Sequence, residues 1–434
     1  MMEDDEVIVV LFEDESYENF FPLTYTRPVF ECRIGMFTML ERTQRLYQKS
    51  KLLLFTRNYI VPTLKKRVSH SVNEPDSIDD DVLLINGALV IDEKTRQLLG
   101  KHLAKNVLMM QKGRIALAHL SEDVARDCGK ELCKSLPSLA LKKLVKKCKT
   151  LEASDLPLMT YPWDLVNKNA ELIKEDYSVF GKKESEGTID STARVYGNEK
   201  DVYVGKGSFV EAHVTLDARD GPIFIGNETT VHSGSRISGP TYIGDRTIIP
   251  SGLIREGCSI GPVCRVGGEL EETIIQGYTN KYHTGFIGHA YIGEWVNLGA
   301  ATTNSDLKNT YGTVQVETRG KKVDTGTTKV GCFIGDHVKT SIGTQIYTGK
   351  KIGVGSQVHG FVTKDVPSFT IWSESLGSKP VELYLQSVIE THGRVLSRRG
   401  AKQTKEEIEL LKKLFEMTAQ ERKEAGVVKG KFVL

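Results

Sequence analysis

The chain has 434 residues, which is long enough for two or three domains that each bury a core. Its 58 basic and 56 acidic residues give a net charge of +2, so it lacks the basic excess of a protein that binds nucleic acid or an acidic membrane surface. No run approaches the roughly 18 apolar residues of a membrane span, and the start, MMEDDEVIVV, is acidic where a signal peptide is basic. We therefore expect a cytoplasmic protein with no nucleic-acid or membrane partner.

The first third of the chain has the pattern of an α/β domain. Short apolar runs at 7–12, 51–55 and 82–85 are typical of buried strands, and residues 33–49 between them have a helical pattern. Residues 121–148 continue as a Lys-rich amphipathic helix. This alternation predicts a parallel or mixed sheet, and we place the domain at residues 1–185.

A six-residue repeat follows. Of the 40 glycines, 28 lie from Gly197 to Gly360. In this region an aliphatic residue recurs every six positions, and a small residue follows most of these four positions later. The aliphatic series begins Ile225, Val231, Ile237, Ile243, Ile249, and the small residues include Thr229, Ser235, Thr241, Thr247, Cys258 and Cys264.

A period of six fits neither a helix nor a single strand, and the strands of a β-sandwich recur at wider and less regular spacing. The period is that of a hexapeptide β-helix, in which three hexads form one coil of about 18 residues with the aliphatic side chains inside. We expect a left-handed parallel β-helix at residues 186–375 and a helical tail at residues 376–434. In the tail, Pro380 is expected to open one helix, and Thr404 with Glu407 forms a capping box for a second.

The seven cysteines, from Cys32 to Cys332, include no CxxC pair, so neither a disulfide framework nor a zinc knuckle is indicated. Cys258 and Cys264 fall at small-residue positions of the repeat and are expected in the core.

Within the repeat, the segments 281–288 (KYHTGFIG) and 292–300 (IGEWVNLGA) stand out. They are similar to the His-x-x-aromatic-[IL]-Gly and Asn-Ile-Gly-Ala segments of the bifunctional enzymes that make UDP-N-acetylglucosamine. Those enzymes acetylate glucosamine 1-phosphate in a β-helix and couple the product to UTP in an N-terminal domain. The resemblance covers residues 190–370.

The resemblance implies a role for each matching residue. His283 would be the general base, Phe286 would replace a sugar-contacting tyrosine, and Asn297 would contact the amino sugar. The acetyl-CoA cleft would be lined by Ala300 and Ser341. Two further matches are Arg255, for an arginine that meets the sugar phosphate, and Asn304, for an asparagine near the base.

The chain departs from the family before the histidine. Glu271 and Glu272 stand where the family has paired lysines, so Lys281 is the candidate replacement cation. Phe286 lacks the tyrosine hydroxyl.

The start of the N-terminal domain differs from the usual nucleotidylyltransferase pattern. The strand at 7–12 leads into Glu13 and Asp14 with no glycine before Gly35, so no glycine-rich loop cradles a triphosphate there. Asn86 follows the strand at 82–85, where an aspartate for magnesium is expected.

The segments 20–31 (FFPLTYTRPVFE) and 161–164 (YPWD) instead resemble a divergent branch of sugar nucleotidyltransferase-like proteins with the same β-helix. This implies Arg27 as a contact for the triphosphate and Asp14 or Asp164 as a ligand for Mg²⁺. The alternative is that Arg27 pairs with Glu31 and that Trp163 belongs to the core.

The implied reaction suits these residue types. A free amine is needed to attack a thioester, and a histidine can accept its proton at neutral pH. The sequence therefore predicts a sugar-phosphate N-acetyltransferase that uses acetyl-CoA, with a nucleotidylyltransferase domain that uses a nucleoside triphosphate and makes a UDP-sugar such as UDP-N-acetylglucosamine. By the resemblance it is a homotrimer, and we expect the loop Asn304–Lys329, which interrupts the hexads, to reach a neighbour.

Two other functions stay open at this point. Some β-helix proteins hold zinc between three histidines and act as carbonic anhydrases, and zinc needs converging ligands. The histidine pairs here are 19 or 22 residues apart rather than one coil apart. The repeat carries His213, His232, His283, His289, His337 and His359. The other alternative is a non-catalytic sugar-nucleotide sensor or scaffold.

Overall fold

The computed structural model describes residues 7–99, 103–134, 137–181 and 184–432. The chain divides into two compact units. The first consists of Met1–Phe20, Thr26–Cys32 and Phe37–Tyr161, and the second of Phe21–Tyr25, Arg33–Met36 and Pro162–Leu434. The domain bounds expected from the sequence stay a prediction.

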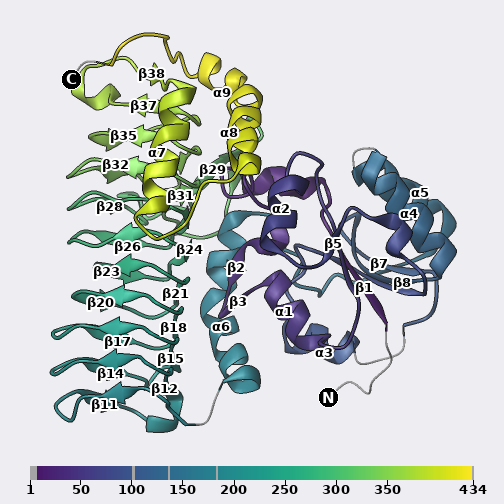
Figure 1. The fold of residues 1–434 in the computed structure, drawn as a ribbon, viewed down its shortest axis with the longest axis horizontal. Coiled ribbons are helices and arrows are strands. Elements are labelled where there is room, and N and C mark those ends of the chain that lie inside the picture. Colours follow the sequence, from purple (N-terminus) through teal and green to yellow (C-terminus); the bar gives the residue numbers. More distant parts are fainter. Residues whose placement is uncertain (1–6, 100–102, 135–136, 182–183, 433–434) are drawn as a thin grey trace. The chain divides into compact units, whose positions relative to one another are not determined.

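The first unit is built on a mixed sheet, as the apolar runs predict (Figure 1). The strand order is β5-β4-β1-β6-β8-β7-β9. Strand β1 pairs in parallel with β4 and β6, and β8 joins β6 antiparallel. The strands are β1 Ile8–Phe12, β4 Leu52–Phe55, β5 Ser71–Val72, β6 Val82–Asn86, β7 Val107–Gln111, β8 Arg114–Leu120 and β9 Lys149–Glu152.

The helices of this unit differ in their bounds from those predicted from the sequence. The helix expected at 33–49 begins only at Met39, because residues 33–38 form the short strands β2 (Arg33–Ile34) and β3 (Phe37–Thr38). Thr38 then caps the helix through a capping box with Glu41. The helix expected at 121–148 is two helices. The helices are α1 Met39–Leu46, α2 Val61–Arg67, α3 Glu93–Leu99, α4 Glu122–Lys134 and α5 Pro137–Lys147.

The second unit confirms the parallel β-helix. Its strands stack coil on coil, and equivalent aliphatic residues face one another in register from coil to coil. One such ladder is Ile225, Ile243, Ile260, Ile275, Ile292, Ile334 and Ile352. All of these are at most 1% exposed, so the hexad aliphatics fill the interior of the coils. Cys258 and Cys264 are fully buried there, as expected.

Three stacks of strands form the faces of the β-helix. The first stack is β10 Thr188–Ile189, β13 Phe209–Val210, β16 Thr230–Val231, β19 Ile248–Ile249, β22 Arg265–Val266 and β25 Asn280–Lys281. The second is β11 Arg194–Tyr196, β14 Thr215–Asp217, β17 Arg236–Ser238, β20 Gly252–Ile254, β23 Gly268–Glu271 and β26 Phe286–Gly288. The third is β12 Val202–Val204, β15 Ile223–Ile225, β18 Thr241–Ile243, β21 Cys258–Ile260, β24 Ile274–Gly277, β27 Tyr291–Glu294, β31 Phe333–Ile334 and β34 Lys351–Ile352.

Later coils carry further short strands. The sheets are β28 Thr303–Asn304, β33 Gln345–Ile346 and β36 Phe361–Val362, and β32 Lys339–Thr340, β35 Gln357–Val358, β37 Thr370–Trp372 and β38 Val381–Glu382. The loop Asn304–Lys329 contains an antiparallel hairpin of β29 (Gln315–Thr318) and β30 (Lys321–Asp324), which the hexad pattern does not reveal.

We call the turn from the first to the second stack the first corner, and the turn from the second to the third stack the second corner. In each coil the chain passes the first corner and then the second.

The remaining helices of the second unit are α6 Pro162–Phe180, α7 Leu385–Ser397, α8 Lys405–Met417 and α9 Ala419–Glu424. The prediction that Pro380 opens a helix is wrong, because Val381 and Glu382 form β38 and the helix α7 begins only at Leu385. The capping box of Thr404 and Glu407 is confirmed at the start of α8. In the described part of the chain, no helix is long and apolar enough to cross a membrane.

Candidate functional site

His283 lies at the first corner, in the turn between β25 and β26. The Nζ of Lys281 donates to the His283 carbonyl oxygen at 2.6 Å, and burial lowers the pKa of Lys281 to about 8. The Tyr282 ring packs edge-on against the imidazole, with ring centroids 5.3 Å apart. The imidazole is exposed and has no hydrogen-bond partner among the described residues. Lys281 therefore holds the turn, and the His283 ring nitrogens stay accessible.

Three of the predicted site residues line one cleft of about 520 Å³ at this corner: His283, Asn297 and Ala300. Their grouping follows from the coil register, because the strand bridges join Asn280 to Asn297 on the first stack. The cleft is completed by Arg265, Asn280, Tyr282, Leu298, Gly299, Ile342, Arg398 and Arg399. Arg398 and Arg399 follow α7 and are not among the site residues that the sequence predicts.

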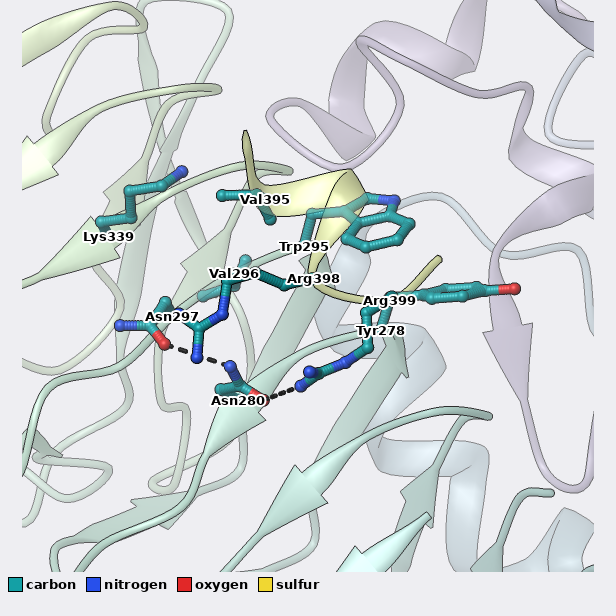
Figure 2. A pocket seen from close by; sticks show the side chains of 9 residues that line it. All are labelled: Tyr278, Asn280, Trp295, Val296, Asn297, Lys339, Val395, Arg398 and Arg399. Atoms are coloured by element: carbon teal, nitrogen blue, oxygen red, sulfur yellow. Dashed lines mark hydrogen bonds between the residues drawn. The ribbon is translucent and has the colours of Figure 1, made fainter. Parts of the chain in front are cut away.

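A second cleft of about 220 Å³ adjoins the first along the first stack. Figure 2 shows Arg399 donating to the Oδ1 of Asn280 at 2.6 Å, and the Nδ2 of Asn280 donating to the Oδ1 of Asn297 at 3.3 Å. Trp295 and Tyr278 stack with centroids 4.5 Å apart at its edge. The two clefts share the polar chain of Arg399, Asn280 and Asn297.

Ala300 and Ser341 lie at the first corner of successive coils. The Ala300 N–H has no acceptor among the described residues, while the Ala300 carbonyl oxygen accepts from Gly343 N at 2.8 Å. A side chain at Gly299 would come within 2.6 Å of the Ser341 backbone, so glycine is required by the close approach of the two coils. Ser341 Oγ is 3.4 Å from Thr344 Oγ1. The first corner therefore has a free backbone donor, the Ala300 N–H, next to the point where the two coils approach closely.

Phe286 lies in β26 of the second stack and Asn304 lies in β28, and neither residue lines this cleft. The Asn304 Nδ2 donates to the Gly288 carbonyl oxygen at 3.0 Å, and its Oδ1 accepts from Gly288 N at 2.9 Å. Asn304 is only 3% exposed, so its amide links two coils. The Phe286 ring occupies the space in which a side chain on Gly288 would lie.

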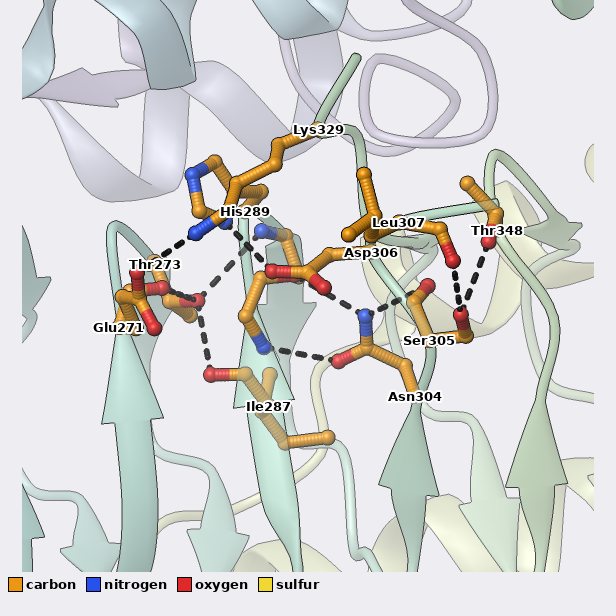
Figure 3. Close-up of polar contacts among 12 residues, drawn as sticks. Glu271, Thr273, Ile287, His289, Asn304, Ser305, Asp306, Leu307, Lys329 and Thr348 are labelled. Carbon is orange, nitrogen blue, oxygen red and sulfur yellow. Dashed lines mark hydrogen bonds and ion pairs between the residues drawn. The ribbon is translucent and has the colours of Figure 1, made fainter. Parts of the chain in front are cut away.

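A separate polar cluster lies at the second corner (Figure 3). His289 Nδ1 is 2.8 Å from Asp306 Oδ2, and Glu271 accepts ion pairs from Arg255 at 2.8 Å and from Lys329 at 3.1 Å. Arg255, predicted to meet a sugar phosphate, is therefore paired with a carboxylate at this corner. The spacing of His289 and Asp306, one short coil of 17 residues, is the signal that identifies this pair in the sequence.

Two carboxyl groups of this cluster are perturbed. Burial raises the pKa of Glu272 to about 7, and the neighbouring Glu256 and Glu271 add to the effect. Burial would also raise the pKa of Asp306, but the hydrogen bond and charge of His289 hold that pKa below its usual value. Asp306 therefore stays ionised beside His289.

In the first unit, Asp14 lies two residues after the end of β1 and is 6% exposed. Its Oδ2 accepts from Arg114 Nε and from Asn86 Nδ2, both at 2.8 Å, and its Oδ1 accepts from Ser16 N at 2.9 Å. Burial favours the neutral acid, yet Arg114 and these donors lower the pKa of Asp14. Both oxygens are engaged by donors, so the arrangement does not fit a magnesium ligand.

The other residues predicted to bind the nucleotide or the metal ion, and the residues named in the alternative, lie in the following places. Arg27 is 7% exposed, and its carbonyl oxygen accepts from Arg57 Nη2 at 2.8 Å. Glu31 accepts from Arg67 Nη2 at 2.6 Å. Asp164 lies in the first turn of α6, in the second unit, and Trp163 is buried against Phe333.

No group of three or more His, Cys, Asp or Glu side chains in the described ranges is placed to hold a metal ion. The zinc alternative therefore has no ligand set among the described residues of one chain.

Comparison with known proteins confirms the resemblance. Residues 9–185 match the family model of sugar nucleotidyl transferases. A bifunctional sugar-1-phosphate nucleotidylyltransferase/acetyltransferase of Sulfurisphaera tokodaii is 35% identical over 100 residues, which are 23% of this chain and 25% of the relative. The bifunctional protein GlmU of Gloeobacter violaceus is 34% identical over 122 residues, 27% of this chain and 23% of the relative. The chain thus spans about a quarter of the length of these curated relatives.

Among solved structures, a UDP-N-acetylglucosamine acyltransferase from Campylobacter jejuni matches with a TM-score of 0.32 and 16% identity. The match covers 55% of this chain and 90% of that chain.

Proposed function

We propose that the β-helix transfers an acetyl group from acetyl-CoA to the amino group of a sugar phosphate such as glucosamine 1-phosphate, with His283 as general base. The observation that carries the proposal is the grouping of His283, Asn297 and Ala300 around one cleft. The relatives named as nucleotidylyltransferase/acetyltransferases support the same chemistry.

The accessible imidazole of His283 suits this role. The amine nitrogen attacks the thioester carbonyl carbon, the C–S bond breaks as the amide C–N bond forms, and His283 accepts the proton that leaves the nitrogen. The same proton can then protonate the departing thiolate. The free N–H of Ala300 is a donor for the oxyanion or for an amide carbonyl of the acyl carrier.

A second candidate base is His289. Asp306 Oδ2 accepts a hydrogen bond from the Nδ1–H of His289 at 2.8 Å, which leaves Nε2 as the basic nitrogen. Such a histidine–carboxylate pair is the usual way to orient a catalytic imidazole. His283 lines the cleft of about 520 Å³ together with Asn297 and Ala300, and His289 is not among the residues that line that cleft. We therefore assign the base to His283 and treat His289 as the comparison.

The first unit is proposed to transfer a nucleotidyl group to a sugar 1-phosphate, with the family match over residues 9–185 in support. Arg27 is the proposed contact for the triphosphate. Magnesium is part of this proposal only through ligands other than Asp14, whose oxygens Arg114 and Asn86 engage. A homotrimer in the cytoplasm, where acetyl-CoA and nucleoside triphosphates are present, completes the proposal.

The test is to incubate the protein with glucosamine 1-phosphate, acetyl-CoA and each nucleoside triphosphate with Mg²⁺, and to identify the products by mass. N-acetylglucosamine 1-phosphate is expected with acetyl-CoA alone, and a nucleoside diphosphate sugar with the triphosphate. If no product forms but a sugar nucleotide binds, the protein is a sensor or scaffold instead.

A further inference from the structure

Three arginines converge on the cleft that contains His283. Arg265 belongs to β22 of the β-helix, and Arg398 and Arg399 directly follow α7. All three line the cleft of about 520 Å³, and Arg398 and Arg399 also line the adjoining cleft (Figure 2). In the described ranges no carboxylate lies within 4.0 Å of any of the three guanidinium groups. We call Arg265, Arg398 and Arg399 the arginine cluster.

The position of α7 accounts for only part of this cluster. Cations are favoured at a helix C-terminus, and Arg394, one turn earlier, is an ordinary surface residue that pairs with Glu390 at 3.1 Å. The helix explains neither Arg265, which comes from a different element, nor the lack of a counter-charge. Like charges around a shared cleft repel one another, and a bound anion would offset that repulsion.

Arg399 is held in a defined orientation. Its Nη2 donates to Asn280 Oδ1 at 2.6 Å, while its Nε is buried and has no hydrogen-bond partner. Burial lowers the pKa of Arg399, and the nearby charges of Arg265 and Arg398 lower it further. The planar fork of a guanidinium is suited to two oxygens of one phosphate group.

The cluster is connected to the proposed site. Asn280, which accepts from Arg399, donates to Asn297 at 3.3 Å, and Asn297 shares the larger cleft with His283. A ligand that reaches the imidazole therefore lies beside the cluster.

We propose that the arginine cluster is an anion subsite that binds a phosphate group of a ligand of the β-helix. The inference rests on the proposed function in so far as that ligand is a substrate. Acetyl-CoA and a sugar 1-phosphate both carry phosphate groups, so the subsite chemistry is the same for either source, and the test distinguishes them.

The experiment is calorimetric titration of the full chain with inorganic pyrophosphate, coenzyme A, 3′-dephospho-coenzyme A and glucosamine 1-phosphate. The variants are Arg398→Gln, the double variant Arg398→Gln/Arg399→Gln, and the control Arg394→Gln. Arg394 lies in the last turns of α7, just before the two arginines, and lines neither cleft. Because one hydrogen bond between charged groups contributes about 1.5–3 kcal/mol, the loss of one such bond weakens binding about 10-fold to 100-fold, and the double variant is expected to bind at least one phosphate ligand more weakly by at least that factor. The control is expected to bind as the wild type does.

The pattern of loss identifies the source. If the double variant loses affinity for coenzyme A and loses less for the 3′-dephospho form, the cluster binds the 3′-phosphate of the acyl donor. If it loses affinity for glucosamine 1-phosphate, the cluster binds the phosphate of the acceptor. Equal affinities of all four ligands for wild type and double variant, or no binding of any by the wild type, overturn the inference. Arg398 is exposed, so Arg398→Gln gives a result even if the double variant is unstable.

Failure of the inference and failure of the proposed function are distinguishable. A wild type that binds phosphate ligands through the arginine cluster but forms no acetylated product keeps the inference and refutes the function. If the wild type forms the acetylated product and the double variant binds the phosphate ligands as well as the wild type does, the function is kept and the inference is refuted.

Discussion

Replacing Asn304 by alanine tests whether this residue supports the fold or contacts a substrate. The resemblance to acetyltransferases implies a place near the base, whereas in the structure its amide makes two hydrogen bonds to the buried backbone of Gly288, at 2.9 and 3.0 Å. Asn304→Ala leaves both the N–H and the carbonyl of Gly288 without a partner. An unsatisfied buried group costs about 1–3 kcal/mol, so we expect the free energy of unfolding to fall by about 2–5 kcal/mol.

The chain offers a selective probe for this measurement. Its three tryptophans, Trp163, Trp295 and Trp372, all lie in the second unit, so urea unfolding followed by tryptophan fluorescence reports on the second unit. The matched control is Asn297→Ala, because Asn297 is exposed and is linked to Asn280 only at 3.3 Å. It should change stability by less than about 0.5 kcal/mol and should impair acetyl transfer.

The opposite pattern would refute the reasoning. If Asn304→Ala unfolds at the same urea concentration as the wild type and only raises KM for the sugar phosphate, Asn304 contacts substrate and its links to Gly288 are dispensable.

Three further predictions concern pH, the nucleotide and assembly. Burial raises the pKa of Glu272 from 4.5 to about 7, so the stability that its protonated side chain contributes is lost as the pH rises through that range. The free energy of unfolding of Glu272→Gln should therefore gain about 2 kcal/mol relative to the wild type between pH 5 and pH 8. A difference between the two proteins in urea unfolding that does not change with pH would contradict this. Arg27→Lys should weaken nucleoside triphosphate binding at least about tenfold, since lysine lacks the planar fork, and equal affinities by titration would place the phosphate site elsewhere. Sedimentation should give a trimer, and deletion of the hairpin Gln315–Asp324 should shift it toward monomer; a wild-type monomer at micromolar concentration is the contrary result.

The β-helix could be predicted in detail because its period is local. Each hexad places one aliphatic side chain inside, so Ile225, Ile243 and Ile260 specify their own register without long-range information. The same repeat predicts which residues of the site lie side by side, since residues one coil apart in sequence, such as Asn280 and Asn297, become neighbours.

Other features depend on packing that a local pattern does not encode. Arg399 reaches Asn280 across 119 positions, because α7 returns along the first stack. The segment Arg33–Met36 has apolar residues that suit a helix, yet it forms part of the second unit, where Arg33 N donates to Tyr291 Oη at 2.7 Å and Gly35 N to Asn169 at 2.7 Å. Buried polar links of this kind override helix propensity.

The most direct test of the account is the rate of acetyl transfer to glucosamine 1-phosphate by His283→Ala, followed by release of the coenzyme A thiol. We expect kcat to fall by about 10²–10⁴-fold with the unfolding transition and coenzyme A binding unchanged, since the imidazole is exposed and its one described ring contact is with the exposed Tyr282. His289→Ala, at the second corner, should retain turnover within a few-fold of the wild type. Unchanged turnover in His283→Ala, with the loss appearing in His289→Ala instead, would contradict the account and move the base to the pair of His289 and Asp306.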